Sequence, residues 1–334
     1  MSAIKNTVMS GIRPTGYLHL GNYFGALRNY VRMQDEYPCF FMVADLHSLT
    51  THPDTSLLKE SVHRVLAENI ACGLDPEKVA LYCQSHVPET SELYLYLNML
   101  AYMGELEKTT TFKDKVRMQP DNVNAGLLTY PVLQTADILL HRANLVPVGK
   151  DQEQHLEMAR NFAQRFNHRY GPVFPEPQAF NYGLELVKVP SLDGVGKMSK
   201  SENQNATLYL ADEDELIRKK LMKAKTDAGP TASDTPKPDY IQNLFALMQL
   251  VSDPVVLAQY ELAYQDCTIR YGDMKKQLGE DMVRFIAPIR EKAAAIQSDT
   301  AYLRRVMQLG AEKARSSALE TMSLVRSAMG LNYY

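Results

Sequence analysis

Pro14-Thr15-Gly16-Tyr17-Leu18-His19-Leu20-Gly21-Asn22 is the stretch that decides the fold of this chain. It follows Thr7-Val8-Met9, a short apolar segment that predicts a strand. It leads into apolar residues at helical spacing, namely Leu20, Tyr23, Phe24, Leu27 and Val31. Glycines at such a turn let the backbone approach a ligand, and the N-terminus of the next helix favours anionic phosphate. The stretch therefore predicts the first β-α unit of a nucleotide-binding sheet.

The alternation of short apolar runs and helical patterns continues to about residue 204. We expect strands at 40–44, 79–83 and 145–148, and helices at 54–72, 91–102, 132–141 and 151–170. This pattern predicts an α/β fold with a Rossmann-like, doubly wound parallel sheet. Such sheets bind ligands at the carboxyl ends of their strands.

The remainder of the chain reads as all-α. We expect helices at 213–224, 243–251, 254–264, 280–298 and 301–329, with a Pro-, Thr- and Ser-rich loop at 229–238. The sequence therefore predicts a catalytic domain at 1–204 and a helical region at 205–334.

Composition and charge narrow the class of protein. The 334 residues are 45% hydrophobic and 22% charged, as in ordinary globular proteins. The net charge of −3 does not by itself indicate a nucleic-acid partner. One basic run is expected to be a solvated helix face: Arg218, Lys219, Lys220, Lys223 and Lys225. No apolar run reaches membrane-spanning length, so no membrane association is expected.

The four cysteines, Cys39, Cys72, Cys83 and Cys267, are scattered without metal-ligand spacing. We therefore expect no structural metal, and reduced thiols in the cytoplasm. The chain contains no tryptophan.

A second motif, Lys197-Met198-Ser199-Lys200-Ser201, follows Gly196. Its spacing lets one loop present two ammonium groups and two hydroxyls to a single triphosphate. Read alone, the stretch is equally a mobile surface loop, and mobility suits a lid that closes on a nucleotide. Together with the His19 turn, it predicts a site that grips a nucleoside triphosphate from two sides.

These motifs form part of an ordered series that resembles class I aminoacyl-tRNA synthetases, and most closely the bacterial-type tryptophanyl-tRNA synthetases. The resemblance runs over nearly the whole chain. It is carried by residues 10–16, 19–23, 43–47, 104–106, 111–115, 125–131, 136–140, 146–152, 197–201 and 310–314.

The resemblance implies a tryptophan–tRNA ligase. Such an enzyme joins tryptophan to ATP, which enters with Mg²⁺, to give tryptophanyl-adenylate and pyrophosphate, and then esterifies tRNA. The attacking carboxylate is already ionised, so the chemistry needs positioning and charge neutralisation rather than a general base.

The family assigns catalysis to His19, Lys197, Lys200 and Lys115. It assigns ATP binding also to Arg13, Pro14, Thr15, Gly21, Asn22, Gly149, Lys150, Asp151, Val189, Met198, Ser199 and Ser201. From the residues alone, three alternatives remain open: a capped turn with a surface histidine at His19, an exposed charge at Lys115 and an N-cap at Asp151. Lys150 stands where the family usually has an acidic residue, so only its backbone contact is expected.

Asp137 lies in an otherwise apolar helix, where a carboxylate is costly unless it has a partner. The family assigns it the indole N–H, while an intramolecular salt bridge or a cap is the alternative. The remaining tryptophan-binding residues implied are Met9, Gly11, His47, Tyr130, Gln134, Ile138, Val146, Val148 and Gln152. Gln152 is expected near the ammonium group. Gln134 departs from the usual Met, and binds the ammonium group, the carboxylate or the indole N–H. Met9 replaces the common Phe.

The resemblance also implies a homodimer, formed through 91–115 within an insertion around 91–130, and binding of the tRNA(Trp) anticodon by the C-terminal helices. Three rival functions share parts of the pattern: a tyrosyl-tRNA synthetase, a small-molecule nucleotidyltransferase and a catalytically silent paralogue. The helical C-terminal part and the Lys197–Ser201 loop argue against the nucleotidyltransferase. Intact His19, Lys197 and Lys200 argue against the paralogue.

Overall fold

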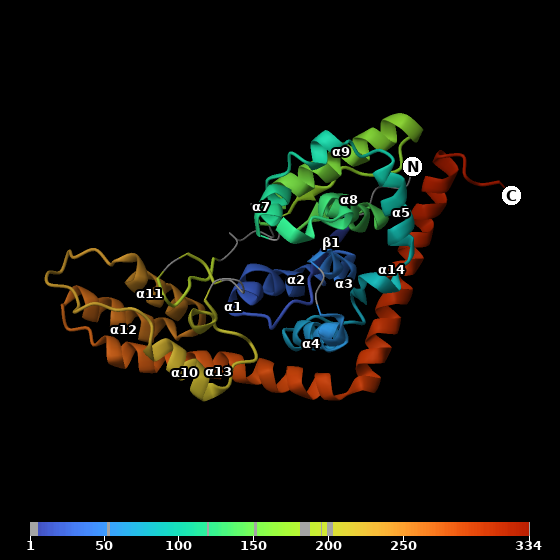
Figure 1. Cartoon of the computed structure of the whole chain (residues 1–334). Coiled ribbons are helices and arrows are strands. Elements are labelled where there is room, and N and C mark those ends of the chain that lie inside the picture. The colour runs from blue at the N-terminus through green and yellow to red at the C-terminus, as the bar shows by residue number, and fades with distance from the viewer. Residues whose placement is uncertain are drawn as a thin grey trace.

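The centre of the molecule is a five-stranded parallel sheet in the order β3-β2-β1-β4-β5. Its middle strand, β1, is labelled in Figure 1. The computed structural model describes residues 6–51, 54–118, 120–149, 152–180, 188–194, 196–198 and 203–333, without the side chains of residues 51, 110, 111 and 118. The strands are β1 (Val8–Ile12), β2 (Cys39–Val43), β3 (Ala80–Cys83), β4 (Leu145–Val146) and β5 (Gln178–Ala179). The predicted Rossmann-like sheet is confirmed.

Helices cover both faces of this sheet. The segments α1 (Leu20–Asn22), the π-helical η1 (Tyr23–Leu27) and α2 (Arg28–Met33) connect β1 to β2. Connections to β3 and β5 run through α3 (Asp45–Ser48), α4 (Leu58–Ala71) and α9 (Glu153–Tyr170). Alternate strand residues enter different cores: Val8, Phe41 and Leu81 join one, whereas Met9, Met42 and Tyr82 join the other. This period of two produces a sheet buried on both faces.

The connection from β3 to β4 holds α5 (Glu89–Asn98), α6 (Met103–Leu106), α7 (Thr110–Met118) and α8 (Ala125–Leu140). The expected helix at 132–141 therefore begins earlier, because Pro131 lies inside α8 and not at its start. Asn124 caps the helix instead, its side-chain oxygen accepting from the Leu127 N–H at 2.9 Å. The proline removes one intrahelical bond, but burial of the apolar face of α8 outweighs that loss.

Described residues from 203 onward form no strand and carry α10 (Asp214–Met222), α11 (Asp239–Val251), α12 (Pro254–Gln265), α13 (Tyr271–Ser298) and α14 (Thr300–Ala328). The all-α prediction is confirmed for this region. The helix expected at 280–298 starts at Tyr271.

The prediction that the basic residues of α10 form a solvated face is wrong for Lys220. This ammonium group is buried, 2.6 Å from Asp212 Oδ2 and 2.8 Å from the Thr207 carbonyl oxygen. A buried lysine needs such partners, and no charge count along the sequence reveals them.

The C-terminal helices return to the sheet. In Figure 1, α13 passes beneath α4 and α14 runs beside α5. A Cβ atom on Gly310 of α14 would lie 1.8 Å from the Leu81 carbonyl oxygen, so only glycine permits this approach to β3. Lys313 donates to the carbonyl oxygens of Pro76 and Glu77, both at 2.7 Å. The division at 204 and 205 stays a prediction.

Within the described part of the chain, no helix combines the length and apolar character needed to cross a bilayer.

Candidate active site

The predicted residues gather at the carboxyl edge of the sheet. β1 lies between β2 and β4, and the order of the strands reverses there. Chain segments leaving neighbouring strands diverge at such a point and open a crevice for a ligand. The His19 turn leaves β1, and α9 follows β4.

The His19 turn forms the start of α1. His19 is the N-cap and only 7% exposed, so the surface-histidine alternative is wrong. Its backbone N–H donates to Asn22 Oδ1 at 3.0 Å, which makes Asn22 a capping residue. A Cβ atom on Gly21 would lie 2.8 Å from the His19 ring, so glycine is needed here. The turn is therefore built to bring backbone and imidazole close together.

The segment around Lys197 contacts this turn. The same Cβ position on Gly21 lies 3.7 Å from the carbonyl oxygen of Met198. Met198 is buried, and its N–H donates to the Val189 carbonyl at 2.9 Å. Backbone bonds from Leu20 N to Leu208 O (3.0 Å) and from Leu210 N to Leu18 O (2.8 Å) join the following segment to the turn. The structure thus brings the two motifs together.

Two cations form a second feature of the candidate site. Lys115 of α7 is partly buried, with its ammonium nitrogen 3.6 Å from the centroid of the Tyr130 ring. Burial and the positive charge of Arg13 lower the pKa of Lys115 to about 8. Burial also lowers the pKa of Arg13. Because Lys115 is partly buried, the exposed-charge alternative for it is wrong.

Other predicted ATP residues lie around these groups or outside the described chain. Pro14 is buried and Thr15 exposed in the segment after β1, Gly149 follows β4, and Val189 is buried. The predictions for Lys150, Asp151, Ser199, Lys200 and Ser201 concern residues outside the described ranges.

Asp137 lies on α8 and is 2% exposed. His47 Nε2 is 2.8 Å from Asp137 Oδ2, and Gln84 Nε2 donates to both carboxylate oxygens at 2.8 and 3.0 Å. Burial raises the pKa of Asp137, while the hydrogen bonds from His47 and Gln84 lower it. The intramolecular partner considered from the sequence is therefore present. Carboxylate oxygens accept up to two bonds each, so Oδ1 keeps capacity for an indole N–H.

Gln84 is a residue that the sequence reasoning missed. It follows β3, is fully buried, and its Oε1 accepts from the backbone N–H of His47 at 3.2 Å. One amide thus orients both members of the His47–Asp137 pair. A glutamine directly after a buried strand is the only sequence signal for it.

The apolar part of the predicted pocket is assembled. Met9, Ile138 and Val146 are buried in one core, and Val148 packs against that core. Gly11 of β1 leaves room for Met42, whose side chain lies 2.9 Å from where a Cβ atom would be.

The polar part joins α8 to α9. Gln134 Nε2 donates to Gln152 Oε1 at 3.4 Å, and His155 Nδ1 lies 3.0 Å from the same oxygen. His155 Nε2 lies 2.8 Å from the hydroxyl of Tyr130. His155 is buried and was also missed, because a histidine within an amphipathic helix carries no distinguishing pattern.

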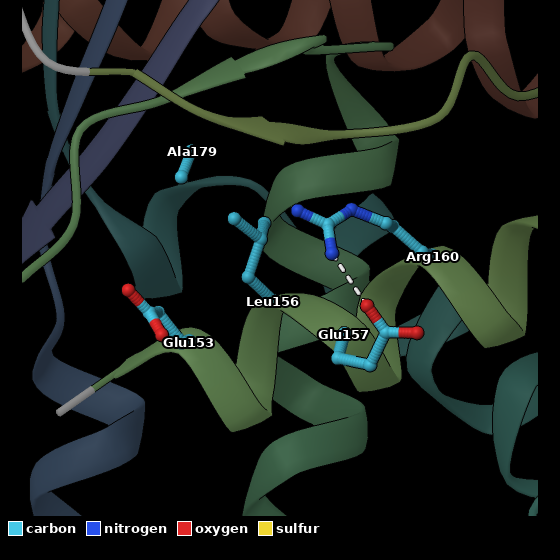
Figure 2. A pocket seen from close by; sticks show the side chains of 5 residues that line it. All are labelled: Glu153, Leu156, Glu157, Arg160 and Ala179. Carbon is cyan, nitrogen blue, oxygen red and sulfur yellow. Dashed lines mark hydrogen bonds and ion pairs between the residues drawn. The ribbon is translucent and has the colours of Figure 1, made fainter. Parts of the chain in front are cut away.

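Two surface hollows lie apart from most of these residues. One hollow has a volume of about 210 Å³, and Tyr130 is the only predicted site residue among those that line it. Its lining consists of Leu46, Leu49, Thr50, Tyr94, Asn124, Gly126, Tyr130 and Leu133. Figure 2 shows the other, of about 400 Å³, where α9 and β5 present Glu153, Leu156, Glu157, Arg160 and Ala179. Arg160 points to Glu157 at 2.5 Å. Its two carboxylates make this hollow unsuited to a triphosphate.

Among the residues that the structure describes, there is no group of three or more His, Cys, Asp or Glu side chains that could hold a metal ion.

The family model described as "tRNA synthetases class I (W and Y)" matches residues 2–287, and the chain belongs to this family. Tryptophan–tRNA ligase of Porphyromonas gingivalis is 57% identical over 325 residues, covering 97% of this chain and 99% of that protein. The Clostridium tetani tryptophan–tRNA ligase is 40% identical over 329 residues, or 98% and 96% of the two chains. The crystal structure of Campylobacter jejuni tryptophanyl-tRNA synthetase, complexed with ADP and tryptophan, has a TM-score of 0.87 and 34% identity over 97% of this chain and 99% of that one.

Proposed function

We propose that the crevice at the ends of β1 and β4 binds ATP and tryptophan side by side and joins them. The chain catalyses tryptophan–tRNA ligation, first forming tryptophanyl-adenylate and pyrophosphate and then transferring tryptophan to tRNA. One observation carries the proposal for the site: Gly21 brings the His19 turn against the Lys197–Met198 segment. The two motifs are more than 170 residues apart in the sequence, and their contact in the fold is what a single ligand held between them requires.

ATP would lie between these two segments. Lys115 would supply positive charge to the phosphates, together with Arg13, whose charge acts on Lys115. Charge on the phosphates rises as pyrophosphate leaves, so preorganised cations lower the barrier of this step. ATP would enter as its magnesium complex, with the ion bound as part of the substrate.

Tryptophan would lie on the other side, among Met9, Ile138, Val146 and Val148. Asp137 would accept the indole N–H, while His47 and Gln84 hold the carboxylate in place. An analogue without the N–H forgoes this hydrogen bond to a buried carboxylate, and a site built to bond a substrate N–H can reject such an analogue by about 10⁴–10⁵. The substrate carboxylate would then face the α-phosphorus, and in-line attack needs no added base.

ATP–pyrophosphate exchange tests this proposal. The protein is incubated with labelled pyrophosphate, ATP and each amino acid in turn. Exchange that depends on tryptophan supports it, whereas dependence on tyrosine, or on no amino acid, would remove it. Because the chain has no tryptophan, binding can be followed in parallel by indole emission from the ligand.

We also propose a homodimer through α5 and α6. Four large apolar side chains are exposed there: Leu95 (52%), Met99 (71%), Tyr102 (62%) and Met103 (57%). Apolar patches of this kind mark protein–protein contacts. Sedimentation of the wild type and of Met99→Glu decides the point, because a dimer should dissociate in the variant and a monomer would be unaffected.

The anticodon of tRNA would bind the C-terminal helices, and the enzyme would act in the cytoplasm, where its product enters translation. Footprinting of tRNA on the protein and cell fractionation test these two assignments.

A further inference from the structure

His155 lies outside every assignment made so far, although it is placed between two residues of the amino-acid side. It is 4% exposed on the first turn of α9. Its ring lies edge-on to Tyr130, with centroids 5.4 Å apart. Its two nitrogens contact Gln152 Oε1 at 3.0 Å and the Tyr130 hydroxyl at 2.8 Å. One imidazole therefore bridges α8 and the start of α9.

The direction of these bonds follows from the atoms. An amide oxygen can only accept, so the Nδ1 of His155 must carry the proton. When the ring is neutral, its Nε2 keeps a lone pair, and the Tyr130 hydroxyl donates to it. Gln134 Nε2 also donates to Gln152 Oε1, which keeps the oxygen of that amide facing the two donors.

A consequence for the substrate follows. Because its proton is directed to His155, the Tyr130 oxygen offers lone pairs and acts as an acceptor. An α-ammonium group carries only donors and needs such acceptors. If the Tyr130 proton instead pointed into the site, it would face the ammonium donors and weaken binding.

We propose that His155 is a positioning residue that sets the hydrogen-bond polarity of Tyr130 and Gln152 for the amino-acid end of tryptophan. The proposal rests on the proposed function for its substrate. His155 is assigned no contact with ATP. Its role also differs from that of Lys115, because His155 contacts the Tyr130 hydroxyl whereas Lys115 lies over the face of the Tyr130 ring.

Three substitutions separate the two contacts. His155→Asn keeps an amide near the Nδ1 position and so preserves the contact with Gln152. His155→Gln keeps one near the Nε2 position and so preserves the contact with Tyr130. His155→Phe keeps a ring but removes both. Tyr130→Phe is the matched change on the partner, since it removes the hydroxyl and retains the ring beneath Lys115.

Michaelis constants for tryptophan and for ATP are measured separately by pyrophosphate exchange. We expect His155→Phe to raise KM for tryptophan at least about tenfold, the size of a lost hydrogen bond to a charged group, while KM for ATP stays within about twofold. The Asn and Gln variants should fall between it and the wild type. In the double variant with Tyr130→Phe, KM for tryptophan should be no more than about twofold higher than in either single variant, because both changes remove the same hydrogen bond.

A purely structural role would lower the fraction of active enzyme and the thermal midpoint but leave the ratio of the two KM values unchanged. Equal rises in both KM values, or no rise in either, would overturn the proposal.

Nitrogen-15 NMR of the wild type provides a test that needs no substrate. The signals of His155, assigned by their loss in His155→Phe, should report a protonated Nδ1 and an unprotonated Nε2. The opposite tautomer would overturn the proposal even if tryptophan-dependent exchange is found. The expected tautomer would support it even if exchange required another amino acid and the proposed substrate were wrong.

Discussion

The two sides of the proposed site differ in what surrounds their polar groups. On the side proposed for the phosphates, the positive charge of Arg13 lowers the pKa of Lys115. On the amino-acid side, Asp137 is paired with His47 and Gln84. An anion bound beside Lys115 would offset the repulsion between these like charges, whereas Asp137 already accepts hydrogen bonds from within the protein.

This difference indicates which kinetic quantity each side should control, the rate of adenylate formation or the binding of the amino acid. Cations placed beside the phosphates stabilise the negative charge that develops there in the transition state, so their effect is on the rate. A carboxylate held by two neighbours selects a ligand by shape and by one hydrogen bond, and its effect is on binding. Substitutions should therefore separate into two kinetic classes.

The largest effect is expected from Asp137→Ala. A site with a buried acceptor can favour tryptophan over phenylalanine by about 10⁴–10⁵, and loss of the acceptor should reduce that preference by at least about 100-fold. The measurement is kcat/KM for each amino acid in pyrophosphate exchange. Asp137→Asn, which keeps one carbonyl oxygen, is the matched control and should lose less. Unchanged discrimination in Asp137→Ala would remove this residue from selection.

The next effect is expected from Lys115→Ala on the phosphate side. Removal of one preorganised charge partner should lower kcat for adenylate formation by about 100-fold. Binding of tryptophan, followed by indole emission, should change by no more than about twofold, since we assign this ammonium group to the phosphates. Lys115→Arg keeps the charge and should recover part of the rate. Equal losses of rate and tryptophan affinity would contradict the separation.

A pH profile tests the role of the Lys115 charge directly. The pKa of Lys115 is lowered to about 8, so the free enzyme holds this charge below pH 8 and loses it above. We expect kcat/KM for ATP to fall by up to about tenfold per pH unit above that point. Lys115→Arg should remove the fall, because an arginine stays protonated. A wild-type profile that stays flat from pH 7 to about 9.5 would contradict this role for the ammonium group.

The smallest effect is expected from Gln84→Met, which keeps most of the side-chain volume but removes the amide. Asp137 then loses two of its hydrogen bonds, and KM for tryptophan should rise about three- to tenfold. The KM for ATP should not follow. Gln164→Met, on an exposed part of α9, is the matched control and should leave both constants unchanged. If KM for ATP rose while KM for tryptophan did not, Gln84 would belong to the ATP site, which would contradict its assignment to the amino-acid side.

Most of the fold was predictable, because it depends on patterns that repeat along the chain. The β/α alternation gave the parallel sheet, and apolar spacing gave the C-terminal helices. The start of α8 was not predictable, since Pro131 is typical of a first turn and Asn124 caps the helix earlier. The burial of Lys220 depends on Asp212 and on a carbonyl group, partners that only the folded chain brings near it.

The candidate site was predictable where its residues form short motifs. His19, Lys197 and Asp137 stand in such stretches, and the structure brings the first two segments together. Gln84 and His155 were not predictable. Each acts through a hydrogen bond to a residue on another element, so neither has a local pattern.

Independence of the two sides is the central claim, and a double-mutant cycle of Lys115→Ala and Asp137→Ala tests it most directly. The quantity is kcat/KM for tryptophan in pyrophosphate exchange at saturating ATP, for the wild type, both single variants and the double variant. Separate sites should give losses that add to within about 0.5 kcal/mol. A coupling energy above about 1 kcal/mol would contradict the account, because it would mean that one network serves both selection and charge neutralisation.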